Sequence, residues 1–215
     1  GLIVEQGPVA QLFDSPQHAY TRHLLASEPT GRPAPPPEGA PLVSTEDLKV
    51  WFPVKSGVFS RVKHHIKAVD GITLAVRPRH TVGIVGESGS GKTTLGLALL
   101  RLIASDGPIV YDGRPLQGLG FKELRPLRRE MQVVFQDPYG SLSPRMSIRD
   151  IVGEGLKVHD MGGSARERRD LVAEALEEVG LEADMMDRYP HEFSGGQRQR
   201  IAIARAMVLR PRFVV

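Results

Sequence analysis

The chain has 215 residues, 40% of them hydrophobic and 25% charged, with 28 Lys and Arg against 25 Asp and Glu and no Cys. This composition is that of a globular protein, and the lack of Cys excludes disulfides and thiolate metal sites. The net charge of +3 is too small to indicate a nucleic-acid partner, and no apolar run is long enough to predict a membrane-spanning helix.

Residues 1–27 predict a small unit separate from the rest of the chain. A short strand is expected first, then a turn at Gly7 and Pro8, then helices at residues 9–13 and 17–27. Residues 28–41 are rich in Pro and Gly and predict a semi-rigid linker. The main domain is therefore expected at residues 42–215. Its abrupt apolar end leads us to expect a fragment of a longer protein.

The main domain opens with a pattern typical of nucleotide-binding α/β units. A Gly-rich stretch follows the third of its predicted strands, and leucines at helical spacing then predict a helix over residues 92–103. Further on, Ser164 and Glu167 have the spacing of a capping box. The other predicted elements are strands at residues 48–52, 72–76, 81–85, 109–111 and 131–135, a basic helix near residues 121–129, two or three helices within residues 147–179, and a final helix from residue 194 to about residue 209.

Residues 86–93 read GESGSGKT and fit the pattern GxxxxGK[ST] at every fixed position. Backbone N–H groups can surround a polyphosphate only where side chains do not obstruct them, which accounts for the glycines. Lys92 would then reach the outer phosphates, and the Thr93 hydroxyl would coordinate Mg²⁺. The plainer alternative is a Gly-rich turn with an incidental Lys, which the strand and helix predicted on either side disfavour.

Residues 193–197 read FSGGQ and predict a second phosphate-receptive helix start. Ser194 has the position of an N-cap, and Gln197 that of its capping-box partner. Each of the two glycines costs about 1 kcal/mol relative to Ala inside a helix. A purely structural helix has little reason to carry both, whereas bare backbone at a helix N-terminus can bind an anion.

Together these motifs resemble those of the ATP-binding cassette (ABC) transporter ATPases. GESGSGKT is similar to the Walker A loop of that family, VFQDP at residues 134–138 to its Q-loop, and FSGGQ to its signature motif, with Phe193 in place of the usual Leu. The resemblance covers nearly all of residues 42–215. It implies an α/β P-loop NTPase core with an antiparallel β subdomain and a helical subdomain at about residues 140–193, truncated before the end of the Walker B strand.

Finer features resemble the dipeptide and oligopeptide importer branch. They are IKAVDGI at residues 66–72, YPHEF at residues 189–193, and residues 1–29, which are similar to the C-terminal tail of a peptide-importer ATPase, although Ala19 replaces its usual Pro. A tail, a linker and a new cassette imply a fused protein with two cassettes. The resemblance further implies permease subunits, indirectly an extracytoplasmic solute-binding protein, and a peripheral position on the cytoplasmic face of the inner membrane.

The resemblance also implies which residues bind ATP and Mg²⁺. In the family, two cassettes close head to tail over the nucleotide, so the signature residues of one reach the ATP of the other. Thr93 and Gln136 would serve the metal, Gln136 would also sense the attacking water, and Phe52, with Trp51 as its rival, would stack on adenine unless both are core or edge-strand residues. The implied phosphate-binding residues are Gly86, Ser88, Gly89, Ser90, Gly91, Lys92, Thr93 and Thr94, with Ser194, Gly195, Gly196 and Gln197 acting across the interface.

In the family, the strand at residues 213–215 continues into an Asp-Glu pair that holds the metal and polarises water, and neither this pair nor the later switch His is in the sequence. We therefore expect an ATP hydrolase in the intact protein and little activity from the 215 residues alone. Two other classes remain as alternatives. One is a soluble ABC ATPase of DNA repair or translation, and the other is a nucleotide-binding remnant without catalysis. No nucleic-acid partner is expected, because the basic runs lack interleaved aromatic residues.

Overall fold

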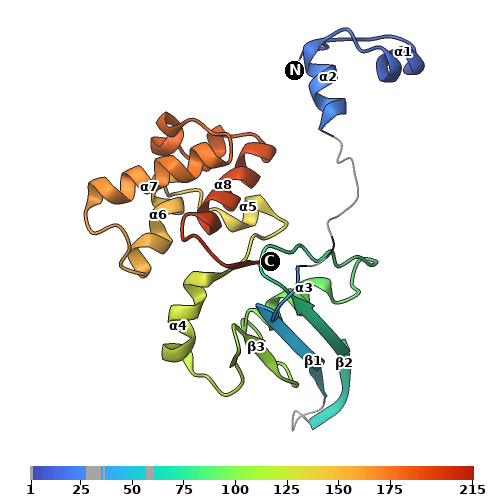
Figure 1. Ribbon diagram of the computed structural model, residues 1–215, viewed down its shortest axis with the longest axis vertical. Helices are drawn as coiled ribbons and strands as arrows, with labels where there is room; N and C mark the ends of the chain where they lie inside the picture. Colours follow the sequence, from blue (N-terminus) through green and yellow to red (C-terminus); the bar gives the residue numbers. More distant parts are fainter. Residues whose placement is uncertain (1, 28–34, 36, 57–60) are drawn as a thin grey trace. The chain divides into compact units, whose positions relative to one another are not determined.

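The computed structural model describes residues 2–27, 35, 37–56 and 61–215, and its chain divides into two units, Gly1–Pro36 and Pro37–Val215 (Figure 1). The first unit contains the helices α1 (Val9–Asp14) and α2 (Ala19–Ala26), both of which the sequence predicts. The strand expected at the start of the chain is not formed, because no other strand of the described unit can complete its hydrogen bonds. Most of the predicted linker at residues 28–41 lies outside the described residues.

In the first unit, the Glu5 carboxylate joins the segment before α1 to the start of α2. Glu5 accepts the backbone N–H groups of Gln17 at 2.7 Å and His18 at 3.1 Å. A side-chain hydrogen bond from Thr21, together with these two, lowers the pKa of Glu5. Neither α1 nor α2 buries a residue, so the described part of this unit has no hydrophobic core.

The second unit contains a four-stranded antiparallel sheet in the order β2-β1-β3-β4. Its main part is a long hairpin in which Val43 pairs with Val76 and Val50 with Val69. The hairpin extends beyond the predicted strands at residues 48–52 and 72–76, because polar residues continue the ladder at the exposed end. The strands are β1 (Val43–Ser56), β2 (Arg61–Val76), β3 (Ile109–Tyr111) and β4 (Arg114–Pro115).

A second, parallel ladder joins β5 (Met131–Gln132) to β6 (Phe213–Val214). The sequence predicts a longer strand at residues 131–135, and only its beginning forms regular structure. The strand predicted at residues 81–85 is wrong for this structure, in which Ile84 is 43% and Val85 93% exposed. A strand needs a neighbour for its hydrogen bonds, and among the described residues β5 and β6 pair only with each other.

The helices of the second unit follow the apolar patterns of the sequence closely. α3 ends earlier than predicted, because Arg101 adopts a left-handed conformation (φ 54°) just after it. The capping box of α7 is confirmed, since the Glu167 N–H donates to Ser164 Oγ at 3.1 Å. The bounds are α3 (Lys92–Leu99), α4 (Phe121–Glu130), α5 (Pro138–Ser141), α6 (Ile148–Val158), α7 (Ala165–Glu178) and α8 (Gly195–Met207), with 3₁₀ turns η1 (Ala183–Asp187) and η2 (Pro190–Glu192).

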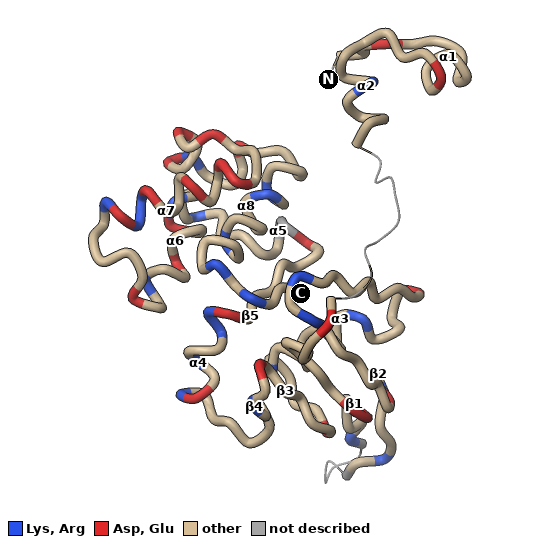
Figure 2. The backbone as a smooth tube through the Cα atoms, in the orientation of Figure 1, with Lys and Arg blue, Asp and Glu red and all other residues tan. Residues whose placement is uncertain are grey.

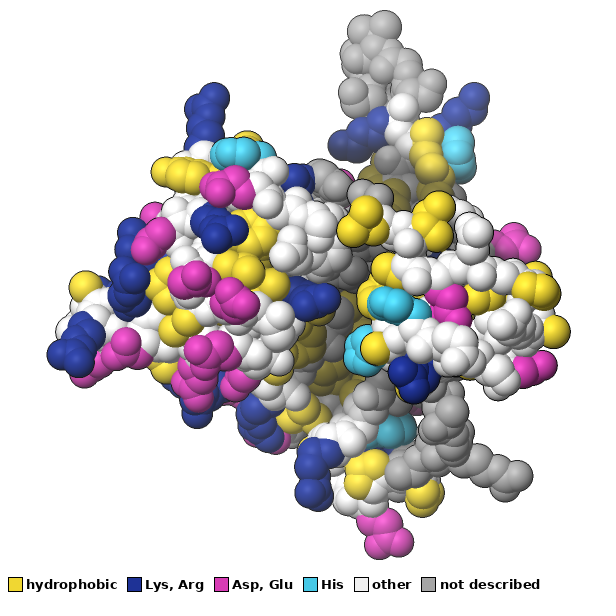
Figure 3. Space-filling view, turned by 90° about the horizontal axis from the view of Figure 1, so that it is seen from above, with side chains coloured by type: hydrophobic (Ala, Val, Ile, Leu, Met, Phe, Trp, Pro, Cys, Tyr) yellow, Lys and Arg dark blue, Asp and Glu magenta, His cyan; other side chains and the backbone are white. Residues whose placement is uncertain are grey.

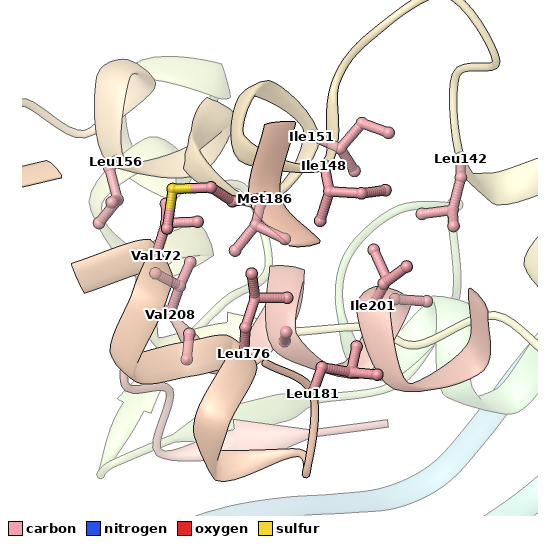
Figure 4. Close-up of a cluster of buried hydrophobic side chains, with 14 of the residues drawn as sticks. Leu142, Ile148, Ile151, Leu156, Val172, Leu176, Leu181, Met186, Ile201 and Val208 are labelled. Carbon is pink, nitrogen blue, oxygen red and sulfur yellow. The ribbon is translucent and has the colours of Figure 1, made fainter. Parts of the chain in front are cut away.

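Two hydrophobic cores result. One lies among α6, α7 and α8, where Ile148, Leu176 and Ile201 are fully buried (Figure 4). The other packs α3 against the antiparallel sheet and the parallel ladder, with Leu48 and Phe213 among its members. The surface of the helical part mixes acidic and basic side chains on the face seen in Figure 3. In the part of the chain that the structure describes, no helix combines the length and apolarity needed to cross a membrane.

Candidate nucleotide-binding site

The Gly-rich loop of residues 86–91 passes over β2 and ends at the N-cap of α3. Gly89 and Gly91 have φ values of 82° and 89°, in the left-handed region that favours Gly. A Cβ at Gly91 would lie 2.0 Å from the carbonyl oxygen of Ala68, whereas one at Gly89 would meet nothing within 4 Å. Backbone packing therefore requires Gly91, while Gly89 is required by conformation alone.

Lys92, the first residue of α3, folds back over this loop. Its Nζ donates to the carbonyl oxygens of Gly86 at 2.8 Å and Glu87 at 2.6 Å, with Ser90 Oγ at 3.4 Å. The first N–H groups of any α-helix lack partners within the helix, so an anion arriving here would meet both an ammonium group and free amides. The loop-to-helix junction that the sequence predicts is present, and the binding of phosphate by residues 86–93 stays a prediction.

Residues far apart in the sequence meet around one cavity of about 900 Å³ beside this loop. Lys92 and Thr93 line it from α3, Gln136 from the loop after β5, and Arg212 from the start of β6. Of the described residues that line the cavity, none has a carboxylate side chain. Basic residues lie along the backbone close to α3 and close to the C-terminus (Figure 2). The cavity thus suits a polyanion and offers hydroxyl and amide oxygens of the kind that Mg²⁺ accepts.

The two aromatic candidates on β1 differ in their surroundings. The Trp51 indole donates to Asp70 Oδ1 at 3.0 Å, and Lys67 Nζ lies 4.2 Å from the centroid of its ring. A cation therefore already covers Trp51. Phe52 pairs with Ile66 across the hairpin and is 44% exposed, and strand alternation places it on the same side of β1 as the buried Val50. Phe52 is therefore the less encumbered of these two aromatic side chains.

α8 begins as the sequence predicts. The Gln197 N–H donates to Ser194 Oγ at 3.3 Å, and the Ser194 N–H donates to Gln197 Oε1 at 3.0 Å. Phe193 is buried in the helical core, so an aromatic residue can anchor this helix start. A Cβ at Gly196 would meet nothing within 4 Å, so packing within the chain does not explain that glycine. None of the described residues 194–197 lines the cavity beside Lys92.

A second cavity, of about 470 Å³, is not predicted by the sequence. It is lined by Phe135, Asp137, Gly140, Ser141 and Arg205. The Arg205 guanidinium donates to the carbonyl oxygen of Ser141 at 2.5 Å, and burial lowers its pKa. This contact ties α8 to the segment that follows Gln136. A charged residue within the apolar run of residues 201–209 was the signal that could have drawn attention to it.

Comparisons with known proteins agree with this geometry. Residues 69–215 match the family model described as ABC transporter. The chain is 62% identical over 216 residues to the peptidoglycan transport ATP-binding protein YejF of Agrobacterium fabrum (strain C58 / ATCC 33970), covering 100% of this chain and 40% of that protein. It is 42% identical over 244 residues to the glutathione import ATP-binding protein GsiA of Salmonella paratyphi A (strain ATCC 9150 / SARB42), covering 100% of this chain and 39% of that protein. The chain thus spans about two fifths of the length of these relatives.

Solved structures confirm the expected fold. The dimeric ABC transporter cassette MJ0796 matches with a TM-score of 0.70 and 28% identity, over 80% of this chain and 72% of that one. The same cassette in a dimeric post-hydrolysis state bound to ADP and Pi matches with a TM-score of 0.68 and 30% identity, over the same shares of the two chains. From its Gly-rich loop, its fold and these relatives, the chain belongs to the ABC transporter family, as part of an ATP-binding cassette protein.

Proposed function

We propose that the chain is the ATP-binding part of an ABC importer that couples ATP binding and hydrolysis to the uptake of peptides. The observation that carries the proposal is the meeting of Lys92, Thr93 and Gln136 around one cavity without a lining carboxylate among the described residues. The relatives named for peptidoglycan transport and glutathione import support a solute with peptide linkages, because both of those compounds contain them.

The loop and α3 would bind the triphosphate. Lys92 would exchange the carbonyl oxygens of Gly86 and Glu87 for phosphate oxygens, which are stronger acceptors for an ammonium group. The backbone amides of residues 89–94 would surround the phosphates, with the dipole of α3 adding to the attraction. Phe52 would stack on the adenine ring.

The donor set of the cavity fits Mg²⁺, which takes oxygen ligands and binds together with nucleotide phosphates. The Thr93 hydroxyl and the Gln136 amide oxygen, which both line the cavity, would hold the ion. When bound, Mg²⁺ neutralises charge that develops on the phosphates. Gln136 would also orient water, and its place on the loop after β5 would let it relay nucleotide binding to the permease subunits.

The signature residues would act on a second nucleotide. Ser194, Gly196 and Gln197 lie away from the cavity beside Lys92, and the packing of this chain does not require Gly196. A head-to-tail pair of cassettes would use both features, because the start of α8 could then close over ATP held by the other cassette. The second cassette would belong to the same full-length chain, with residues 1–27 as the end of a preceding cassette.

Hydrolysis would need carboxylates that the described lining of this cavity does not supply. General-base assistance typically contributes 10²- to 10⁴-fold. We therefore propose that residues 1–215 alone hydrolyse ATP very slowly and that the longer protein supplies the acids. The longer protein would work at the cytoplasmic face of the inner membrane, with permease subunits and, indirectly, a solute-binding protein.

ATP titration of the full-length protein tests the proposal. Replacing Lys92 by Ala should weaken ATP binding at this site about 10- to 100-fold and leave the site of the other cassette unchanged, since a hydrogen bond to a charged group is worth about 1.5–3 kcal/mol. Lys122→Ala is the matched control, because Lys122 is exposed on α4. Equal affinities of wild type and Lys92→Ala would contradict the proposed site.

A further inference from the structure

The short strand β6 is held by backbone hydrogen bonds to β5 and also by side-chain contacts of Arg212, the residue before it. Three backbone hydrogen bonds tie this segment to the β5 segment: Arg212 N–H to the Glu130 carbonyl at 3.0 Å, Val215 N–H to the Gln132 carbonyl at 3.0 Å, and Val134 N–H to the Val215 carbonyl at 2.8 Å. A ladder this short contributes little resistance to sliding or fraying. The residue that opens it, Arg212, makes a second set of contacts through its side chain.

The Arg212 guanidinium binds Asp112 with both ends of its fork. Nη1 lies 2.6 Å from Asp112 Oδ2, and Nη2 lies 3.0 Å from Oδ1. Nη1 is also 3.7 Å from Glu130 Oε2, and that oxygen accepts the Tyr111 hydroxyl at 2.8 Å. Burial and this carboxylate raise the pKa of Tyr111. Four side chains from β3, its turn, α4 and the start of β6 thus form one network.

Asp112, whose carboxylate binds Arg212, lies in the tight turn between β3 and β4. Asp112 and Gly113 have φ values of 49° and 75°, as in the tight two-residue turns that join adjacent antiparallel strands. The Asp112 N–H donates to the Leu42 carbonyl at 2.8 Å, and Tyr111 is only 2% exposed. A bidentate pair anchored on such a turn holds the guanidinium at one position along the strand, and it also pairs its positive charge with a carboxylate.

The opposite end of β6 meets the helix that carries the phosphate loop. A Cβ at Gly96 of α3 would lie 2.7 Å from Val215 Cγ1, so Val215 lies directly against the backbone of α3. β6 can therefore shift little along its axis without either colliding with α3 or losing contact with it. The Arg212 network and the Gly96 contact define the position of the strand from its two ends.

We propose that Arg212, held by Asp112 and Glu130, is a positioning residue that sets β6 in register against the phosphate-loop helix. The predicted effect on ATP hydrolysis rests on the proposed function, whereas the position of β6 does not. Residues that follow β6 would reach the reacting phosphate only if the strand is in register, whereas Lys92 and its loop would bind ATP regardless. Arg212 also lines the cavity, but Asp112 and Glu130 already balance the charge of its guanidinium, so it would add little to nucleotide binding. Loss of the network should therefore lower kcat and leave the KM for ATP nearly unchanged.

The chain offers a matched control two residues earlier. Arg210 binds Glu174 with Nη2 at 3.0 and 3.2 Å from the two carboxylate oxygens, but this exposed pair joins the start of the same segment to α7. Arg210→Met and Arg212→Met remove the same groups from neighbouring positions. Only the second change removes contacts to Asp112 and Glu130.

The test uses the full-length protein and two readouts. Arg212→Met should speed amide hydrogen exchange at Val134 and Val215 about tenfold and lower kcat about 10- to 100-fold, with KM changed less than about threefold. Arg210→Met should change neither readout. Arg212→Lys, which keeps the charge but not the fork, should fall between wild type and Arg212→Met, and it provides the same comparison if the Met variant does not fold.

Equal exchange rates for the Arg210 and Arg212 variants would overturn the inference, and so would a parallel loss of kcat and ATP affinity in Arg212→Met. If the wild-type protein neither binds nor hydrolyses ATP, the proposed function fails. The exchange measurement then still decides whether Arg212 positions β6.

Discussion

At the scale of single residues, the structure separates glycines that packing requires from glycines that conformation requires. Gly91→Ala places a methyl group 2.0 Å from a backbone oxygen that cannot rotate away, so the phosphate loop must move off β2. We predict loss of ATP binding and a lower melting temperature. Gly89→Ala is the control for stability alone, with open space around its Cβ and only the strain of a left-handed Ala, about 1–2 kcal/mol. Thermal unfolding with and without ATP would measure both, and wild-type ATP binding by Gly91→Ala would contradict the packing argument.

The Arg212–Asp112 pair also predicts a pH dependence. The hydrogen bond from Arg212 lowers the pKa of Asp112 below its ordinary value of 3.8. A folded-state pKa below the unfolded one stabilises the protein above the unfolded pKa, and this contribution is lost as the pH falls through the folded pKa. The difference in unfolding free energy between wild type and Asp112→Asn should therefore be constant near neutral pH and shrink below pH 3.8. In an Arg212→Met background the difference should lose this dependence, as urea unfolding at a series of pH values can show.

At the scale of elements, α7 and α8 both begin with a Ser capping box. Comparing the two caps distinguishes an effect on stability from an effect on function. Ser164 caps α7 and Ser194 caps α8 through the same reciprocal hydrogen bonds. Replacing either by Ala should cost about 1 kcal/mol of unfolding free energy. In the full-length protein, only Ser194→Ala should also lower the rate of ATP hydrolysis. If both variants keep the wild-type rate, the start of α8 is a structural cap and nothing more.

The elements also show what the sequence could and could not predict. Helices with an apolar stripe and a cap were predictable, because both signals are local, and α7 and α8 lie close to the expected bounds. The strand expected at residues 81–85 failed because strand formation depends on a neighbour that local pattern does not reveal. The Arg212 network escaped prediction for a similar reason, since its partners Asp112 and Glu130 are distant in sequence.

At the scale of the whole molecule, the motifs at residues 86–93, 134–138 and 193–197 sufficed to predict the family, because together and in this order they are far more specific than any one of them. The structure adds that Lys92, Thr93 and Gln136 line one cavity and that residues 194–197 lie away from it. It also identifies Phe52 as the less encumbered of the two aromatic candidates, because Lys67 covers Trp51. The roles of these residues in binding ATP stay predictions that the variants above can test.

The central claim is that the Gly-rich loop before α3 holds a triphosphate that the start of an α8-like helix closes from a second cassette. A structure of the full-length protein with Mg²⁺ and a non-hydrolysable ATP analogue tests it most directly. We predict that the phosphates lie among the amides of residues 89–94, that Lys92 Nζ has left the carbonyl oxygens of Gly86 and Glu87, and that a Ser hydroxyl of the other cassette reaches the γ-phosphate. A nucleotide bound elsewhere, or a Lys92 still bonded to those carbonyls beside the bound phosphates, would contradict the account.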